Sequence, residues 1–417
     1  MDRWNEDGDG NRGGACSTQS AVDTTSAPGP AQSCQDAVDR TVDTKPLVAV
    51  GLMSGTSMDG IDAALLTTDG ERVLHFGGVA TYPYAEAFRT RLRALLGSAP
   101  GTEADDVVRE LTVLHAAAVE RLLTAVGVDA AAVDVVGFHG HTVLHRPERR
   151  LTRQMGDGQA LADLLGIPVV ADFRSADVAA GGHGAPLASL FHAAMAWSVM
   201  KPVAVLNIGG VANVTWIGDA PDGGDLVMAF DTGPGNALVD DWVRRMSGRR
   251  WDERGRLARG GRVRDDLVTA WLGDPYFRAP PPKSLDRNTY AAVLDAVVGL
   301  SAEDGAATLT AFTVRAVAQG QAFLPVPPSR WLICGGGRLN GTMMAMLADA
   351  LPAPVEPVEA AGWDGDALEA QAFAFLAVRS VKGLPLSLPS TTGVPAPTRG
   401  GVMHRPGGVA AAGAGLR

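Results

Sequence analysis

The sequence GLMSGTSMDGID at residues 51–62 separates two apolar runs, LVAV at 47–50 and AALL at 63–66. This arrangement predicts two strands joined by a turn that is rich in Gly, Ser, Thr and Asp. The segment NIGGVANVT at 207–215 repeats the pattern in the second half of the chain. Between the two repeats, apolar residues recur with helical spacing at 85–97 and 104–124. We therefore expect a duplicated α/β architecture, and an all-β fold is disfavoured.

Further elements follow from the same patterns. After the first repeat, Asp69-Gly70 marks a hairpin turn into a third strand, ERVLHFGGVA. Apolar runs predict buried strands at 133–140, 167–173 and 331–334, and a strand, a Gly-rich turn and a second strand at 202–219. Helices are expected at 341–350 and 366–381, and a shorter helix is expected to begin near Asp157.

Composition and charge limit the classes of function. The 417 residues include 36 Lys and Arg against 46 Asp and Glu, which gives a net charge of -10. Nucleic acids and anionic membranes attract clustered cations, so neither is expected as a partner. Three cysteines, Cys16, Cys34 and Cys334, match neither a zinc site nor a disulfide framework, and the N-terminus lacks a signal-peptide core. We expect a cytoplasmic protein, and the sequence leaves open whether it forms a homodimer.

Both ends of the chain have the composition of loose segments. Residues 1–45 are rich in small and polar residues, with few large apolar side chains, which predicts a disordered N-terminal tail. Residues 395–417 are rich in Pro, Gly and Ala and are predicted to be a flexible C-terminal tail.

The turn at 51–62 has the composition of a phosphate-binding loop. Gly55 and Gly60 would let backbone N–H groups approach an anion, and Ser54, Thr56 and Ser57 add hydroxyl donors. Asp59 and Asp62 carry carboxylates that suit Mg²⁺. The plain alternative is a structural hairpin turn, but three hydroxyls, two glycines and two carboxylates exceed what a turn needs.

Two other glycine-rich loops each follow an apolar strand and precede a helix. They are Asp231-Thr232-Gly233-Pro234-Gly235-Asn236 and Gly335-Gly336-Gly337-Arg338-Leu339-Asn340. A phosphate suits the first position because helix N-termini present free N–H groups, and three glycines allow a flat ligand to lie against the backbone. Alone, each loop has an ordinary structural explanation. The chain contains neither a P-loop lysine motif nor a dinucleotide fingerprint after its first strand.

The three loops in this order resemble those of the sugar-kinase, actin and heat-shock-chaperone superfamily, and within it the sequence is similar to the anhydro-N-acetylmuramic acid kinase family. The resemblance covers residues 46–394 and rests on many short motifs. These include GLMSGTSMDGID, GFHGHTVLHRP (137–147), GDGQALA (156–162), ADFRSADVAAGGHGAPL (171–187), NIGGVANVT, FDTGPGN (230–236), DPYF (274–277), ICGGGRLN (333–340) and LPSTTGV (388–394).

The resemblance implies a fold and an activity. The fold is α/β, with two duplicated actin-like (ribonuclease H-like) domains and a nucleotide cleft between them. Residues 46–175, completed by a C-terminal helical region at 366–394, would form the first domain, and residues 176–365 the second. The enzyme would use ATP, Mg²⁺ and water to open 1,6-anhydro-N-acetylmuramic acid and phosphorylate it to N-acetylmuramic acid 6-phosphate, in cell-wall recycling.

The resemblance also implies roles for individual residues. Asp177 matches the family's catalytic base, with Asp172 as a structural or supporting carboxylate. His141, Thr142, Arg174 and Glu369 would contact the sugar, and Asp59 and Asp231 would hold Mg²⁺. The nucleotide-binding residues would be Gly55, Thr56, Ser57, Met58, Asp59, Gly60, Ile61, Asp62, Asp231, Gly233, Gly235, Asn236, Gly335, Gly336, Gly337 and Asn340.

The chain departs from the family pattern at three places. His141 and His183 stand where glutamine is usual, so we expect groups that titrate near neutral pH close to the sugar. The usual KSTGRE element reads Lys283-Ser284-Leu285-Asp286-Arg287-Asn288. Two other functions stay open: a kinase of the same fold for another sugar, and a non-metabolic ATPase of the actin or chaperone type.

Overall fold

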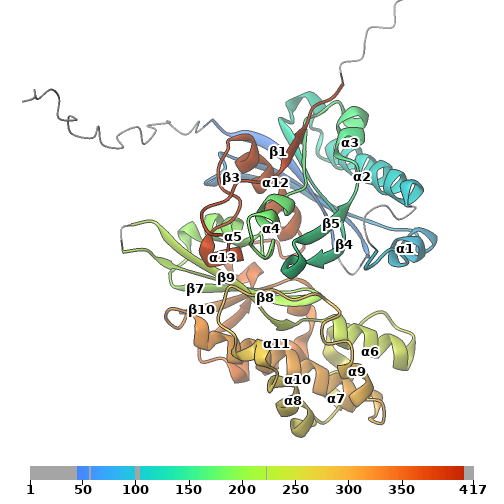
Figure 1. Ribbon diagram of the computed structural model, residues 1–417, viewed down its shortest axis with the longest axis vertical. Helices are drawn as coiled ribbons and strands as arrows, with labels where there is room; N and C mark the ends of the chain where they lie inside the picture. The colour runs from blue at the N-terminus through green and yellow to red at the C-terminus, as the bar shows by residue number, and fades with distance from the viewer. Residues whose placement is uncertain (1–44, 56–57, 99–103, 222, 408–417) are drawn as a thin grey trace, which may run out of the picture. The chain divides into compact units, whose positions relative to one another are not determined.

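The computed structural model describes residues 45–55, 58–98, 104–221 and 223–407 (Figure 1). Its strands are β1 (Leu47–Ser54), β2 (Gly60–Thr68), β3 (Val73–Pro83), β4 (Val135–Arg146), β5 (Leu151–Met155), β6 (Val169–Ala171), β7 (Val203–Ile208), β8 (Val211–Asp219), β9 (Asp225–Pro234), β10 (Arg330–Cys334), β11 (Val355–Pro357) and β12 (Val402–His404).

Helices connect and cover these strands. They are α1 (Glu86–Arg93), α2 (Asp105–Val126), α3 (Gly158–Leu165), α4 (Ser175–Ala179), α5 (Ser189–Met195), α6 (Ala237–Ser247), α7 (Arg256–Gly260), α8 (Asp265–Leu272), α9 (Val293–Ala296), α10 (Ala302–Gly320), α11 (Gly341–Ala350), α12 (Leu368–Val381) and α13 (Pro389–Thr392).

The strands form two sheets with the same topology. The first has the order β12-β6-β4-β1-β2-β3, with β5 paired to β4, and the second has the order β11-β10-β7-β8-β9. In each, three consecutive strands form an antiparallel meander, and the first of them also pairs in parallel with a later strand. This repeated topology confirms the predicted duplicated α/β architecture.

The alternating side chains of the first sheet bury two separate cores. Val50 and Leu52 of β1 pack in a core with α2 and α3, whereas Ala49 and Met53 of the same strand pack with α12. Side chains in a strand alternate between its faces, so helices cover both faces of this sheet. Figure 1 shows α12 (red) beside the much earlier strand β1.

Two glycines in the central strands explain how closely α12 approaches. A Cβ atom at Gly51 would lie 1.8 Å from the carbonyl oxygen of Ala370, and one at Gly137 would lie 2.1 Å from that of Phe373. Any other residue at either position would push the helix away from the sheet. The position of α12 matters because its first turn carries Glu369, which faces the cleft described below.

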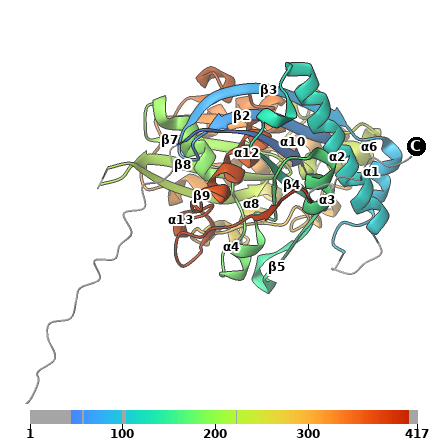
Figure 2. The same ribbon diagram turned by 90° about the horizontal axis from the view of Figure 1, so that it is seen from above.

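Local sequence signals explain several helix ends, and the one near Asp157 was predicted. Asp157 caps α3 by accepting a hydrogen bond from the backbone N–H of Ala160. The 22-residue α2 begins with Asp105 and Asp106 and ends at Gly127, whose φ of 68° is left-handed. In Figure 2, α2 and α3 lie near one another on the same side of the first sheet.

The second sheet is covered by α10 and α11 on one face, through residues such as Val314 and Leu347. Its other face shares a core with α5, α12 and the first sheet. Buried residues from both sheets thus form one shared hydrophobic core.

The C-terminal segment is more ordered than its composition indicated. The sequence placed the start of a flexible tail at 395, but β12 pairs antiparallel with β6 from Val402↔Ala171 to His404↔Val169. That part of the prediction is wrong, because a three-residue edge strand held by a distant partner leaves no local signal. The predicted N-terminal tail, 1–45, lies almost wholly outside the described residues.

Candidate active site

A single cavity of about 1520 Å³ collects most of the predicted site residues. We call it the cleft. Its walls come from the β1–β2 hairpin, the β7–β8 hairpin, the loop after β10 and the start of α12. Segments from both sheets therefore face one solvent-accessible space.

Twelve predicted site residues line the cleft. They are Gly55, Asp59, Gly60, Asp62, Thr142, Arg174, Asp231, Asn236, Gly335, Gly336, Asn340 and Glu369. Of the other predicted residues that the structure describes, seven lie behind the wall: Met58, Ile61, His141, Asp177, Gly233, Gly235 and Gly337. Thr56 and Ser57 lie outside the described residues.

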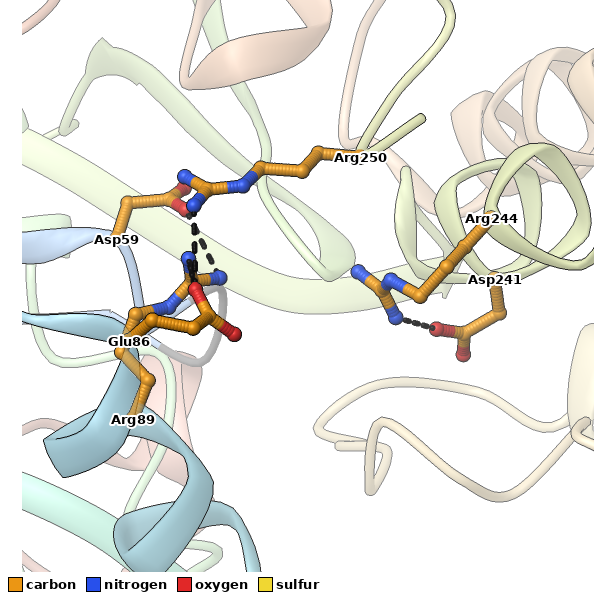
Figure 3. Close-up of polar contacts among 6 residues, drawn as sticks. All are labelled: Asp59, Glu86, Arg89, Asp241, Arg244 and Arg250. Carbon is orange, nitrogen blue, oxygen red and sulfur yellow. Dashed lines mark hydrogen bonds and ion pairs between the residues drawn. The ribbon is translucent and has the colours of Figure 1, made fainter. Parts of the chain in front are cut away.

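Charged side chains gather around Asp59, which follows the tip of the first hairpin (Figure 3). Arg89 is only 3% exposed, and its guanidinium lies 3.7 Å from a carboxylate oxygen of Asp59 and 3.0 Å from one of Glu86. The guanidinium of Arg250 approaches the same Glu86 oxygen to 3.3 Å. Asp59 is therefore paired with a cation in this structure, which reduces its capacity to hold a metal ion.

The second predicted phosphate loop, residues 231–236, is only partly a loop, and Asp231 and Asn236 are its residues that line the cleft. Residues 231–234 belong to strand β9, and Gly233 packs against Ala316 and Phe277 away from the cleft. The cleft is also lined by Gly209 and Gly210, the turn of the β7–β8 hairpin. This hairpin is the counterpart of the first one, and the repeat NIGGVANVT was the signal that could have identified it.

Gly235 and Asn236 support that hairpin from behind. The backbone N–H of Asn236 donates to the carbonyl of Gly209 at 2.7 Å, and its side-chain amide donates to that of Ile208 at 2.9 Å. A Cβ atom at Gly235 would lie 2.3 Å from the Gly209 carbonyl oxygen. The glycine at 235 is thus needed for close packing, although it does not line the cleft.

The third loop lies where it was predicted. Gly335 has a φ of 70°, and a Cβ atom there would lie 2.3 Å from the side-chain oxygen of Asn207. Gly336 is exposed to the cleft, and Asn340 caps α11 by accepting from the backbone N–H of Met343 at 3.0 Å. The loop therefore places bare backbone beside the second hairpin and leads into a capped helix.

Asp177 lies just beneath the cleft surface. Its carboxylate is 2% exposed and accepts from the backbone N–H of Gly184 at 2.6 Å and from the hydroxyl of Thr392 at 2.5 Å. Gly182 covers it: a Cβ atom there would lie 2.2 Å from Asp177 Oδ1. Contact between Asp177 and a molecule in the cleft would therefore require movement of the loop at 181–184.

Arg174 lines the cleft among three carboxylates. Its guanidinium donates to His139 Nε2 at 3.0 Å and to the carbonyl of Gly184 at 2.6 Å. Burial lowers the pKa of Arg174, and the nearby charges of Glu369, Asp231 and Asp177 oppose that change. Arg174 is thus the cation around which these predicted site carboxylates are arranged.

The carboxylates themselves are disposed to bind a proton or a cation. Burial, followed by the charge of Asp62, raises the pKa of Glu369, which accepts from the Asn207 amide at 3.2 Å. Glu369 is exposed to solvent and lines the cleft. Burial also raises the pKa of Asp62, with smaller contributions from Asp366 and Asp59.

Asp231 has a strongly perturbed pKa. It is 4% exposed, and burial raises its pKa from 3.8 to about 7, although the Leu285 backbone N–H and Arg174 lower it. A carboxyl group whose pKa is raised on folding stabilises the protein fully below its ordinary pKa. That stabilisation is lost as the pH rises toward 7, and at higher pH the buried charge costs about 4 kcal/mol.

Asp231→Asn should therefore change stability in a pH-dependent way. Without ligands, the variant should unfold with a free energy a few kcal/mol larger than the wild type at pH 8 and nearly equal to it at pH 4. Denaturant unfolding at both pH values measures this, with the exposed Asp219→Asn as the matched control. A difference that does not depend on pH would show that Asp231 is not charged at pH 8.

Burial lowers the pKa values of three histidines in and behind the cleft wall. Burial lowers the pKa of His141 and of His145 to about 4, and it also lowers that of His183. His141 and His145 are therefore uncharged at neutral pH. The expectation of titration near pH 7, made for His141 and His183, is wrong for His141, because a buried imidazole favours its neutral form.

Sequence reasoning missed several residues of the cleft wall. Asn207 and Asn213 flank the second hairpin, and residues 251–254 and 284–289 add a further side. In the last of these, Ser284 bonds to Nδ1 of His183 at 3.0 Å. The Lys283–Asn288 element had been noted only as a departure from the family pattern, so its presence in the wall was not predicted.

Comparison of the sequence with known proteins identifies the family of this chain. The family model described as anhydro-N-acetylmuramic acid kinase matches residues 47–405. The protein of this name from Rhodospirillum rubrum is 58% identical over 85% of this chain and 93% of its own. That of Paramagnetospirillum magneticum is 57% identical over 86% of this chain and 100% of its own. The chain belongs to the anhydro-N-acetylmuramic acid kinase family.

Likeness to solved structures is looser. The activator of the 2-hydroxyisocaproyl-CoA dehydratase from Clostridium difficile, with bound ADPNP, matches at a TM-score of 0.41 and 12% identity, over 81% of this chain and 96% of that one. A likeness of this size is too loose to bear on function. Separately, no helix in the described part of the chain is long and apolar enough to cross a membrane.

The extent of the family match leads to a prediction about the N-terminus. Residues 1–44 precede the matched region and carry few large apolar side chains. Deleting them should leave kinase activity within about twofold and the melting temperature nearly unchanged, because little burial is lost. Activity assays and thermal unfolding of the truncated protein test this, and a large fall in melting temperature would show that the segment docks.

Proposed function

We propose that this kinase acts on 1,6-anhydro-N-acetylmuramic acid, taking its phosphate from ATP and releasing N-acetylmuramic acid 6-phosphate and ADP. The observation that carries this proposal is the cleft itself, in which two glycine hairpins, a glycine-rich loop and a group of carboxylates meet in a chain of this family. Such a surface offers backbone N–H groups to phosphates and carboxylates to a sugar and a cation.

We place the nucleotide between the two hairpins and the loop at 335–340. Gly55 and Gly60 of the first hairpin and Gly209 and Gly210 of the second would receive the phosphates. The exposed backbone at Gly336 suits the flat part of the nucleotide. Phosphoryl transfer depends mainly on positioning and on neutralising charge, which these groups supply without covalent chemistry.

The carboxylates fit a magnesium ion that is completed by phosphate oxygens. In the described part of the chain, no three His, Cys, Asp or Glu side chains gather closely enough to hold an ion alone. Mg²⁺ at phosphate sites usually takes one or two carboxylates, with phosphates and waters completing its shell. Asp231 and Asp59 are the proposed ligands, and Asp62 is an alternative because Asp59 already faces Arg89. Bound Mg²⁺ would neutralise phosphate charge.

The chemistry asks for a base that activates water. Water bonds to the anomeric carbon and its proton passes to the base, while the bond from that carbon to the oxygen at carbon six breaks. That oxygen then takes the γ-phosphate of ATP. We assign the base to Asp177, which lies beneath the loop at 181–184 and would reach the water once that loop moves.

Arg174, Thr142 and Glu369 are the proposed sugar contacts. All three line the cleft near the loop at 181–186 or the base of the hairpins. His141 does not line it, so we reassign it from a direct contact to a residue behind the wall.

One assay separates this proposal from its alternatives. ATP turnover should be slow alone and should rise strongly with the anhydro sugar, giving a phosphorylated and ring-opened product by mass spectrometry. Equal turnover with and without the sugar would favour a non-metabolic ATPase. Faster phosphorylation of a different sugar would favour another kinase of the same fold.

A further inference from the structure

Ser54 is the last residue of β1 and stands at the entrance to the first hairpin. It lines the cleft although it is only 1% exposed. Its hydroxyl has two buried polar neighbours: the hydroxyl of Tyr84 at 2.9 Å and Nδ1 of His141 at 3.0 Å. These three residues form a chain of hydrogen bonds directly behind the proposed phosphate site.

Tyr84 holds both limbs of the first hairpin. Its hydroxyl donates to Ser54, before the tip, and its backbone N–H donates to the carbonyl of Asp59, after the tip, at 3.0 Å. The side chain is 7% exposed, and its ring packs 5.0 Å from that of Phe88. One buried residue thus fixes the spacing of the two limbs.

A bulge in β4 brings His141 to Ser54. Leu52 pairs with Phe138 and Ser54 pairs with His141, so three residues of β4 span two of β1. Gly140, with a φ of 70°, supplies the backbone conformation that the bulge needs. His141 is fully buried, and its Nε2 has no hydrogen-bond partner.

The number of protons on Ser54 and His141 limits which hydrogen bonds the Ser54 hydroxyl can make. A serine hydroxyl has one proton and accepts two hydrogen bonds, and a neutral imidazole carries one N–H. With the imidazole proton on Nδ1, both Tyr84 and His141 donate to Ser54, and the serine proton is free to point into the cleft. With the proton on Nε2, Ser54 must donate to His141, and a buried N–H is left without an acceptor, which is costly.

We propose that Tyr84 and His141 are positioning residues that direct the hydroxyl proton of Ser54 toward a phosphate oxygen of the bound nucleotide. The proposal rests on the proposed function only in taking the ligand of this part of the cleft to be a nucleotide. It assigns a purpose to two polar residues behind the wall and explains why a polar side chain lies opposite Ser54.

The test compares four variants with a matched control. Ser54→Ala, Tyr84→Phe and His141→Leu should each raise the KM for ATP, on the order of tenfold, because a hydrogen bond to a charged oxygen is lost or misdirected. His141→Gln should stay within about twofold, since its amide also donates. The KM for the anhydro sugar, measured at saturating ATP, should change less than twofold. Tyr82→Phe, on the neighbouring strand β3 with its ring facing Arg121, should change neither.

Several outcomes would overturn the proposal. One is a KM for ATP within about twofold of wild type in both Tyr84→Phe and His141→Leu. Another is an equal rise in both KM values, which indicates a merely structural role. In the unsubstituted protein with ADP bound, ¹⁵N NMR should find the His141 proton on Nδ1, and finding it on Nε2 would contradict the proposal whatever the variants do.

Failure of the proposed function would be recognised separately. In that case the wild-type protein would not phosphorylate the anhydro sugar at all. The positioning role would still be tested, because ADP binding to the same variants by calorimetry should weaken in the same order.

Discussion

The Asp177→Asn enzyme should bind ATP like the wild type and yet lose a factor of about 10²–10⁴ in sugar-dependent turnover. The asparagine oxygen still accepts from Gly184, and its amide donates to Thr392, so both buried contacts of Asp177 survive. What is lost is the ability to take a proton from water. Steady-state kinetics with the anhydro sugar and calorimetry with ATP measure the two effects separately.

Asp172→Asn is the matched control for that variant. Asp172 has a φ of 53°, which asparagine also adopts readily, and its carboxylate accepts from the Ser175 backbone N–H at 3.3 Å. Its variant should retain turnover within a few-fold. The reverse result, with Asp177→Asn active and Asp172→Asn inactive, would move the base to Asp172. Activity in both would direct attention to Asp231, whose pKa of about 7 suits proton transfer near neutral pH.

Local signals predicted the parts of the fold that are determined locally. The Asp69-Gly70 turn, the Asp157 cap and the apolar period of α2 are each readable within a few residues, and each element formed where expected. β4 continues past Gly140 to Arg146, and β12 forms inside the predicted tail, because both depend on pairing with distant strands. Pairing between distant segments leaves little trace in the periodicity of either one.

The residues of the candidate site also divide into those with a local sequence signal and those without one. The first hairpin and the loop at 335–340 could be singled out from the sequence because glycines cluster beside polar groups within a short stretch, and both segments line the cleft. At 231–236 the sequence did not show that Gly233 and Gly235 serve close packing and that only Asp231 and Asn236 line the cleft. Tyr84 gave no signal, since its role comes only from tertiary contacts with Ser54 and Asp59. The burial of Asp177 beneath Gly182 could not be read from spacing either.

The contacts of Arg174 indicate why the site carboxylates act together. Arg174 lowers the pKa of both Asp231 and Glu369, whereas burial raises both. Its guanidinium is fixed by His139 on one side and by the Gly184 carbonyl on the other. Because Gly184 also donates to Asp177, the same short loop ties the cation to the proposed base. A change at Arg174 should therefore affect charge and geometry at once.

Arg174→Met should lower kcat/KM for the anhydro sugar by about 10²–10³, the loss typical when a preorganised electrostatic group is removed. The kcat/KM of Arg174→Lys should lie between those of the wild type and Arg174→Met. Lysine keeps the charge, but its single ammonium group cannot donate to His139 and Gly184 as the forked guanidinium does. Without the positive charge of Arg174, the pKa values of Asp231 and Glu369 should rise further. The acidic limb of the pH–rate profile should then move to higher pH in Arg174→Met and less in Arg174→Lys. Profiles of kcat/KM from pH 5 to 9 test this, and an unchanged limb in Arg174→Met would mean that Arg174 acts by position and not by charge.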